Sequence, residues 1–233
     1  MKPRCWVVLP AAGAGRRMGT SIPKQYLTVL GRTVLEHTLS IFTDRVDIAG
    51  IAVALASDDP YWPELQIPGK ERFLTLTGGD DRMISVRNAL HALSAMALPD
   101  DWVLVHDAAR PCLREEDLSR LIETLYDDPV GGILATPLRD TLKRQASDAR
   151  HIIEATIDRD GLWLAQTPQM FRLGALSMAL NKALELGWKI TDEASAMERW
   201  GASPHIVRGH ADNLKITHAE DLPLAEFLLS TRT

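Results

Sequence analysis

Basic residues are not in excess in this sequence of 233 residues. Its 26 Lys and Arg residues are outnumbered by 31 Asp and Glu residues, which gives a net charge of −5 at pH 7. Proteins whose main partner is nucleic acid usually carry a basic excess that clusters on one face or in one segment. The composition therefore argues against a nucleic-acid partner.

Cysteine and long apolar runs are also scarce. The two cysteines, Cys5 and Cys112, form neither a metal-ligand pair nor a disulfide framework, so we expect reduced residues that pack in the core. No segment approaches the roughly 18 consecutive apolar residues of a membrane span. Met1 to Arg4 leads into an apolar run without a cleavage-site pattern. We therefore expect a cytoplasmic protein with no membrane partner.

Short apolar runs alternate with segments of helical periodicity, which is typical of α/β proteins with a mostly parallel sheet between two helical layers. We predict one domain over residues 1–233. The predicted strands are Trp6 to Pro10, Ile51 to Leu55, Phe73 to Leu76, Trp102 to His106, Gly132 to Thr136 and His205 to Val207. The predicted helices are centred on residues 35–42, 86–93, 118–125, 173–184 and 224–229.

One excursion, at about residues 138–168, interrupts this alternation. Two extended pieces, Thr141 to Arg144 and Ile152 to Ile157, flank a polar stretch, and this pattern predicts a β-hairpin arm. An arm that cannot bury both of its faces against its own domain commonly packs against a partner. We therefore expect a homodimer that is joined through the arm.

The first predicted strand runs into a loop of small residues, Pro10 to Gly19. Small residues let backbone N–H groups approach a triphosphate closely, and Arg16 and Arg17 add positive charge at the strand's carboxyl end. With Lys24 nearby, these cations repel each other unless an anion joins them. The glycine spacing fits neither a Walker P-loop nor the dinucleotide fingerprint. The loop predicts a triphosphate site, and a purely structural turn is the alternative.

Two further strand ends carry polar residues. Thr77 to Arg82 holds a glycine pair and leads into a helix with Ser85. This segment suits recognition of a base or ribose, and the alternative is that it forms only a turn and a helix cap.

After the next strand, Asp107 is suited to hold Mg²⁺ against phosphate oxygens. Arg110 either pairs with phosphate or anchors the loop, and His106 is expected to be a core or supporting histidine rather than a catalytic one.

The C-terminal third adds two candidates. Lys215, which we predict to lie in a short strand within Asp212 to Thr217, is a candidate phosphate ligand because of the other cations. Thr191 is expected to be a helix N-cap, and a substrate contact from its hydroxyl is the alternative.

Taken in order, these segments resemble the 2-C-methyl-D-erythritol 4-phosphate cytidylyltransferases of the non-mevalonate isoprenoid pathway. Each segment is moderately specific, but their joint order is highly specific and covers nearly the whole chain. The resemblance implies a Rossmann-like nucleotidyltransferase fold of the nucleotide-diphospho-sugar transferase type, a homodimer joined by the β-arm, CTP, and a divalent metal such as Mg²⁺, Mn²⁺ or Co²⁺. The matching segments are AAGAGRRMG with PKQ after it, GGDDR, VHDAARP, IDRDGLWLAQTPQMF, TDEASAME and DNLKIT.

The resemblance also implies roles for individual residues, and some of these residues would reach across the dimer. Asp107 matches the metal-binding aspartate. The catalytic candidates are Arg17, Lys24, Lys215 and Arg159. The nucleotide-binding candidates are Ala11, Ala12, Gly13, Ala14, Gly15, Gly79, Asp80, Ser85 and Arg110. The substrate-binding candidates are Thr141, Arg159, Thr167, Thr191 and Lys215.

The expected reaction transfers CMP from CTP to 2-C-methyl-D-erythritol 4-phosphate and releases pyrophosphate. A cytidylyltransferase for another polyol phosphate, such as ribitol 5-phosphate, is one alternative, because its nucleotide side would look much the same. A non-catalytic nucleotide-binding regulator is another, although it has no reason to combine a metal aspartate with two sets of phosphate cations. A nicotinamide oxidoreductase is disfavoured by the glycine spacing.

Overall fold

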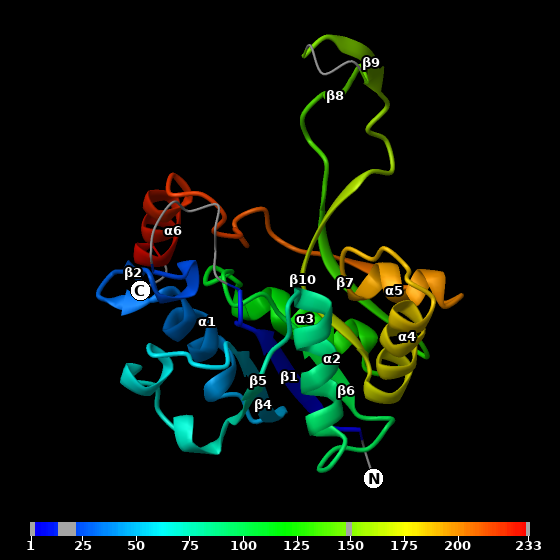
Figure 1. The fold of residues 1–233 in the computed structure, drawn as a ribbon. Helices are drawn as coiled ribbons and strands as arrows, with labels where there is room; N and C mark the ends of the chain where they lie inside the picture. Colours follow the sequence, from blue (N-terminus) through cyan, green and yellow to red (C-terminus); the bar gives the residue numbers. More distant parts are fainter. Residues whose placement is uncertain (1–2, 14–21, 148–150, 232–233) are drawn as a thin grey trace.

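A seven-stranded sheet forms the centre of the molecule. The structure is a computed structural model that describes residues 3–13, 22–147 and 151–231. The strand order is β11-β7-β10-β6-β1-β4-β5, and only β10 in this sheet runs antiparallel to its neighbours (Figure 1). The mostly parallel α/β fold predicted from the sequence is confirmed. The seven strands are β1 (Cys5–Pro10), β4 (Ile48–Leu55), β5 (Leu74–Thr77), β6 (Trp102–Val105), β7 (Gly131–Pro137), β10 (Trp163–Arg172) and β11 (His205–Arg208).

Helices cover both faces of this sheet. α1 and α3 pack on the face that contains Val7 and Leu9, whereas α2, α4 and α5 pack on the face that contains Trp6 and Val8. Because side chains alternate along a strand, β1 must be apolar throughout to fill both layers. The helices are α1 (Val34–Thr43), α2 (Arg82–Leu93), α3 (Glu115–Leu125), α4 (Leu173–Glu185), α5 (Glu193–Arg199) and α6 (Asp221–Ser230). The short elements are β2 (Thr28–Val29), β3 (Arg32–Thr33), η2 (Lys24–Tyr26), η3 (Trp62–Glu64) and η4 (Lys70–Arg72).

The two cysteines lie in these packed layers. Cys5 and Cys112 are both buried, as expected from the sequence. Burial, assisted by the charge of Asp47, raises the pKa of the Cys5 thiol to about 12, so this thiol stays protonated at neutral pH. Cys5 therefore acts as a packing residue.

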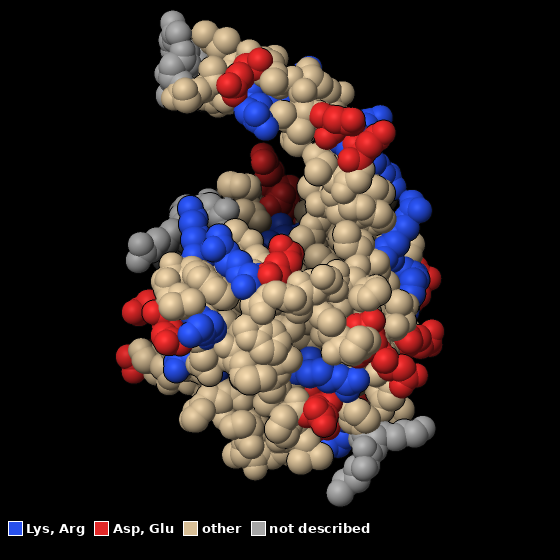
Figure 2. All heavy atoms as spheres, turned by 90° about the vertical axis from the view of Figure 1, so that its right-hand side faces the viewer, with Lys and Arg blue, Asp and Glu red and all other residues tan. Residues whose placement is uncertain are grey.

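The arm projects from the body as a separate two-stranded antiparallel sheet (Figure 1). Its strands are β8 (Leu142–Gln145) and β9 (Ile153–Ile157), which lie within the predicted excursion. Figure 2 shows open space between the tip of the arm and the body beneath it.

The sequence prediction missed β10, because it assigned these residues to the end of the arm. The C-terminal half of β10 lies between β6 and β7 in the central sheet. Its polar residues obscure the apolar pattern that marks the other strands. Gln166, Thr167 and Gln169 are nevertheless buried, and Gln166 Nε2 donates to the carbonyl of His210 at 2.9 Å.

Two local predictions near the C-terminus are wrong. Lys215 lies in an irregular segment rather than a strand, although the N–H of the next residue, Ile216, donates to the carbonyl of Ala109 at 2.9 Å. The N-cap of α5 is Asp192 rather than Thr191, because the Asp192 carboxylate accepts a hydrogen bond from Ser195 N. The cap therefore lies one residue later than predicted.

The surface agrees with the charge balance of the sequence. On the face shown in Figure 2, Lys and Arg are interspersed with Asp and Glu rather than gathered into one basic patch.

Among the described helices, none combines the length and the apolar character needed to cross a bilayer.

Candidate active site

A cavity of about 770 Å³ lies at the carboxyl ends of four parallel strands. Its walls come from the segments that follow β1, β4, β5 and β6, which topology brings to the same edge of the sheet. Lys24, Gln25, Lys215 and Thr217 complete the lining. The cavity therefore collects most of the described residues that the sequence assigned to the nucleotide.

The loop after β1 forms one wall of the cavity. Ala11, Ala12 and Gly13 line it, while the predicted residues Ala14, Gly15 and Arg17 lie outside the described residues. The Gln25 side chain, which is buried, donates to the carbonyls of Ala11 at 2.7 Å and Gly13 at 3.2 Å. Gln25 was not predicted as a site residue, and it fixes the start of this loop.

The glycine pair after β5 forms the wall beside this loop. A Cβ atom on Gly78 would lie 2.5 Å from the Cβ of Ala12, and one on Gly79 would lie 2.1 Å from Cγ2 of Ile84. Both positions therefore need glycine for close packing. The Ser85 hydroxyl accepts from Gly79 N and donates to the carbonyl of Asp81, each at 3.0 Å, so it holds the turn.

Asp80, Lys24 and Lys215 place charged side chains in the lining of the cavity. Asp80 is exposed and lines the wall formed by the glycine turn. Lys24 Nζ donates to the carbonyl of Ile216 at 2.8 Å, and Lys215 Nζ lies 2.8 Å from Asp107 Oδ2. Two lysines from distant parts of the chain thus meet in a cavity large enough for a nucleotide.

Asp107 is the electrostatic centre of this edge. Its carboxylate, 8% exposed, contacts Arg82 Nε at 2.9 Å, Lys215 Nζ at 2.8 Å and Arg110 Nε at 3.3 Å. Burial raises the pKa of this carboxyl, but the positive charges of Arg82, Lys215 and Arg110 outweigh burial and hold the pKa well below its usual range. Asp107 is therefore ionised at neutral pH.

A buried chain of hydrogen bonds supports Asp107 from behind. Its backbone N–H donates to Thr167 Oγ1 at 3.0 Å, and this hydroxyl lies 3.0 Å from His106 Nδ1. Burial lowers the pKa of His106 to about 4, so the ring is neutral. With Nδ1 accepting from Thr167, the Nε2–H donates to the carbonyl of Arg110 at 3.1 Å. His106 and Thr167 thus shape the loop and do not line the cavity.

The remaining predicted residues are distributed over three places. Arg110 anchors the loop, since its Nη1 donates to the carbonyl of Asn213 at 2.6 Å and it does not line the cavity. Thr191 lines a second cavity of about 350 Å³ beside the first. Thr141 and Arg159 are exposed on the arm and line neither cavity, and the Arg159 guanidinium donates to the carbonyl of Arg139.

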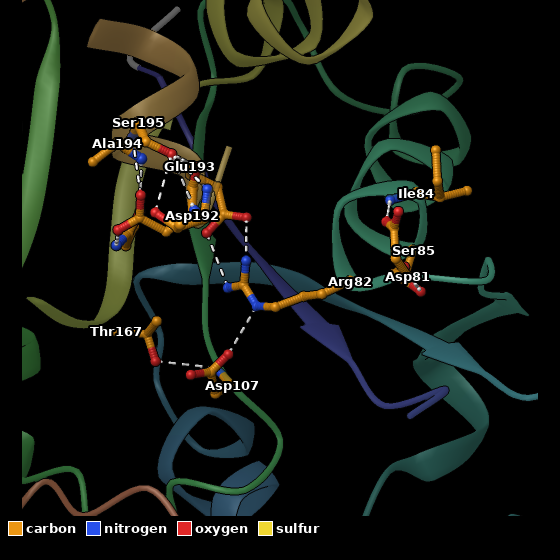
Figure 3. A network of polar contacts seen from close by, with 12 residues as sticks. Asp81, Arg82, Ile84, Ser85, Asp107, Thr167, Asp192, Glu193, Ala194 and Ser195 are labelled. Carbon is orange, nitrogen blue, oxygen red and sulfur yellow. Dashed lines mark hydrogen bonds and ion pairs between the residues drawn. The ribbon is translucent and has the colours of Figure 1, made fainter. Parts of the chain in front are cut away.

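Arg82 and Glu193 are functional candidates that the sequence reasoning did not select. Arg82 reaches from the start of α2 to both Asp107 and Glu193 (Figure 3). The sequence gave little indication of either role. Arg82 is only the last residue of the GGDDR segment, and Glu193 looks like an ordinary acidic residue in the first turn of a helix. Glu193 is only 1% exposed, and this burial results from the fold and not from the local sequence.

The donor set at Asp107 fits a metal bound partly by substrate. The described residues contain no cluster of three or more His, Cys, Asp or Glu side chains that could enclose a metal ion. Mg²⁺ is commonly held by one or two carboxylates together with substrate phosphates and water, and a single ionised carboxylate at the cavity wall matches that pattern.

Comparison with known proteins assigns this architecture to a family. The sequence pattern of the family IspD, 2-C-methyl-D-erythritol 4-phosphate cytidylyltransferase, matches residues 5–231. The chain belongs to this family. The member from Ectopseudomonas mendocina is 56% identical over 223 residues, which are 95% of this chain and 94% of the relative. The member from Pseudomonas aeruginosa is 56% identical over 221 residues, or 94% of each chain.

Solved structures of the cytidylyltransferase family have the same fold. A crystal structure of 4-diphosphocytidyl-2C-methyl-D-erythritol synthase superposes with a TM-score of 0.85 at 40% identity, covering 98% of this chain and 99% of that one. The Francisella tularensis cytidylyltransferase superposes with a TM-score of 0.83 at 37% identity, covering 97% and 99%. The Rossmann-like nucleotidyltransferase fold implied by the resemblance is confirmed.

Proposed function

We propose that this chain transfers CMP from CTP to 2-C-methyl-D-erythritol 4-phosphate, giving 4-diphosphocytidyl-2-C-methyl-D-erythritol and pyrophosphate in isoprenoid precursor biosynthesis. Family membership over residues 5–231 carries this conclusion. The cavity at the carboxyl edge of the sheet supports it, because Lys24 and Lys215 both line this cavity.

The reaction needs no general base from the protein. A phosphate monoester has its second pKa at about 6, so the acceptor phosphate is largely ionised at neutral pH. One of its oxygens forms a bond to the α-phosphorus of CTP, the bond to the bridging oxygen breaks, and the electron pair leaves with pyrophosphate. The chain's contribution is to align these atoms and to stabilise the negative charge that develops.

The described residues divide this work among three groups. Ala11, Ala12 and Gly13 place a backbone loop beside the triphosphate, and Lys24 contributes positive charge there, together with Arg17 from outside the described residues. Lys215 meets the incoming phosphate. Gly79, Asp80 and Ser85 form the wall that receives the cytidine.

A divalent metal, Mg²⁺ or another ion such as Mn²⁺ or Co²⁺, is part of the proposal. Asp107 would hold it, and phosphate oxygens would supply further ligands. When bound, such an ion neutralises charge on the phosphate oxygens. Lys215 Nζ now contacts Asp107 Oδ2, so lysine and metal share the same carboxylate in this proposal.

The arm supports the proposal of a homodimer. Leu142 in β8 and Ile153 in β9 are apolar but 38% and 61% exposed, because the hairpin has no second layer to cover them. Thr141 and Arg159 line neither cavity of their own chain. We infer that the arm packs on a second copy and carries both residues to its acceptor side. The cytoplasmic location expected from the sequence also stays a prediction.

Pyrophosphate release tests the activity directly. The protein is supplied with Mg²⁺, each of the four nucleoside triphosphates, and either 2-C-methyl-D-erythritol 4-phosphate or ribitol 5-phosphate. We expect release with CTP and methylerythritol phosphate alone. A preference for ribitol phosphate would overturn the acceptor assignment, and no release by folded protein with any pair would overturn the activity.

A further inference from the structure

Arg82 joins two buried carboxylates that belong to different elements (Figure 3). Its Nη1 and Nη2 donate to Oε1 and Oε2 of Glu193 at 2.6 and 2.9 Å, and its Nε donates to Oδ1 of Asp107 at 2.9 Å. A planar guanidinium held through all three nitrogens has its orientation fixed. Arg82 is therefore a rigid bridge between Glu193 and Asp107.

The two residues that flank Glu193 are hydrogen-bonded to the central sheet. Gln169, in β10, accepts from Ala194 N at 2.8 Å and donates to Asp192 Oδ2 at 2.8 Å. These bonds hold the first turn of α5 against β10, which pairs with β6. Glu193 therefore holds Arg82 at a fixed place relative to β6, the strand that precedes Asp107.

The bridge determines how the Asp107 carboxylate is turned. With Oδ1 engaged by Arg82, Oδ2 is left to Lys215 at 2.8 Å and Arg110 at 3.3 Å. Without Arg82, the carboxylate could rotate so that each oxygen meets one of the two remaining cations. Such a rotation would shift Lys215 Nζ within the cavity.

We propose that Arg82 and Glu193 are positioning residues that fix the rotation of the Asp107 carboxylate and, through it, the place of Lys215 Nζ. The inference rests on the proposed function, in which Lys215 meets the incoming phosphate. Arg82 also lines both the large and the small cavity, so the bridge stands in the wall that they share.

The decisive variant removes the whole bridge. Arg82→Met alone would leave Glu193 buried without its partner, which destabilises folded proteins strongly. Arg82→Met combined with Glu193→Met removes one charge of each sign, so the net charge of the cluster is unchanged. Buried pairs replaced by apolar groups of similar volume often keep their stability. We expect the melting temperature to return close to that of the wild type.

Activity separates a positioning role from a structural one. In the double variant, we expect kcat to fall on the order of 10- to 100-fold, because small misplacements of reacting groups have effects of this size. CTP affinity, measured by calorimetry, should stay within about threefold, since Arg82 acts through Asp107. Arg82→Lys should lose turnover similarly, because one ammonium cannot reproduce the planar fork.

A matched pair at the opposite edge of the sheet provides the control. Arg45 holds Asp47 through Nε at 2.9 Å and Nη2 at 2.6 Å, just before β4 begins. Arg45→Met with Asp47→Asn should leave kcat unchanged.

Three outcomes are distinguishable. A folded Arg82→Met/Glu193→Met protein with kcat within twofold of the wild type would overturn the positioning role. Loss of CTP binding in that protein would also overturn it, since Arg82 would then act on the nucleotide itself. Absence of turnover in the wild-type protein would instead overturn the proposed function.

Discussion

The cavity and the arm both carry residues assigned to the substrates, but the chain holds them in different ways. Asp107 contacts three cations, and its backbone N–H donates to Thr167, so several independent contacts fix its position. Thr141 and Arg159 are exposed on the arm, next to its two-stranded sheet, which stands away from the body. The nucleotide side is thus organised within one chain, whereas the arm leaves its residues to be positioned by a second copy in the homodimer that we propose.

The largest expected effect comes from removing a cation of the cavity. In Lys215→Ala, Asp107 keeps Arg82 and Arg110 as partners, so the fold should persist. The incoming phosphate loses its lysine, and kcat should fall on the order of 10²- to 10³-fold, as for other charge-stabilising groups. Initial rates of pyrophosphate release, together with melting temperatures, measure both quantities.

A surface lysine serves as the control for this variant. Lys182 pairs with Glu185 on the exposed side of α4, and Lys182→Ala should turn over normally. Wild-type turnover in folded Lys215→Ala would remove Lys215 from the mechanism and weaken the view that the cavity side is complete within one chain.

Acid should weaken the body through His106. Burial lowers its pKa from 6.5 to about 4, so between these values the unfolded chain binds a proton that the folded chain does not. Stability therefore falls as the pH drops through this window, by about 3 kcal/mol once pH 4 is reached. Urea unfolding of the wild type and of His106→Gln at pH 7, 6, 5 and 4 measures the slope, which should be shallower in the variant. Equal slopes would contradict the assignment.

The sequence predicted the centre of the body well because the strands β1, β6 and β7 are buried on both faces. Runs such as the one from Trp6 to Leu9 are apolar throughout, and their ends then carry the glycines and charges of the site. The strand β10 escaped notice for the opposite reason, since Gln166 and Gln169 are polar but buried, with hydrogen-bond partners from distant segments. Periodicity cannot reveal partners that only the fold supplies.

The same reasoning explains which site residues were found. Asp107 follows an apolar strand directly, so its place at the edge of the sheet could be predicted. Arg82 and Glu193 lie 111 positions apart in the sequence, and nothing in either local pattern indicates that they meet. Arg110 was expected either to pair with phosphate or to anchor the loop, and Thr167 was predicted to bind the substrate; in the structure both hold the loop around Asp107.

A mixing experiment sharpens the comparison between cavity and arm. Arg159→Ala removes a charged group from the arm, and we expect an approximately tenfold loss of kcat/KM for the acceptor, which corresponds to the loss of a charge-assisted contact. If the arm serves the partner's cavity, mixing this variant with Lys215→Ala creates dimers in which one cavity is intact and receives an intact arm. With random pairing, about a quarter of all sites should then be fully active.

The readout is the rate of the mixture relative to the mean of the separate variants, after the chains have been unfolded and refolded together. A rate well above that mean supports an arm that acts across the dimer. A rate equal to the mean, with dimers present by sedimentation, would place Arg159 in service of its own chain.

The smallest expected effect is at Gln25, which holds the loop after β1. Gln25→Leu keeps the volume of the side chain but removes the donors to the carbonyls of Ala11 and Gly13. The loop should lose order rather than charge, so KM for CTP should rise by about fivefold, equivalent to about 1 kcal/mol, while kcat stays nearly constant. Gln66→Leu, at an exposed position, is the control. A fall in kcat with unchanged KM would mean that Gln25 acts on the reacting groups. The contacts within one chain would then affect the reaction step as well as the binding of CTP.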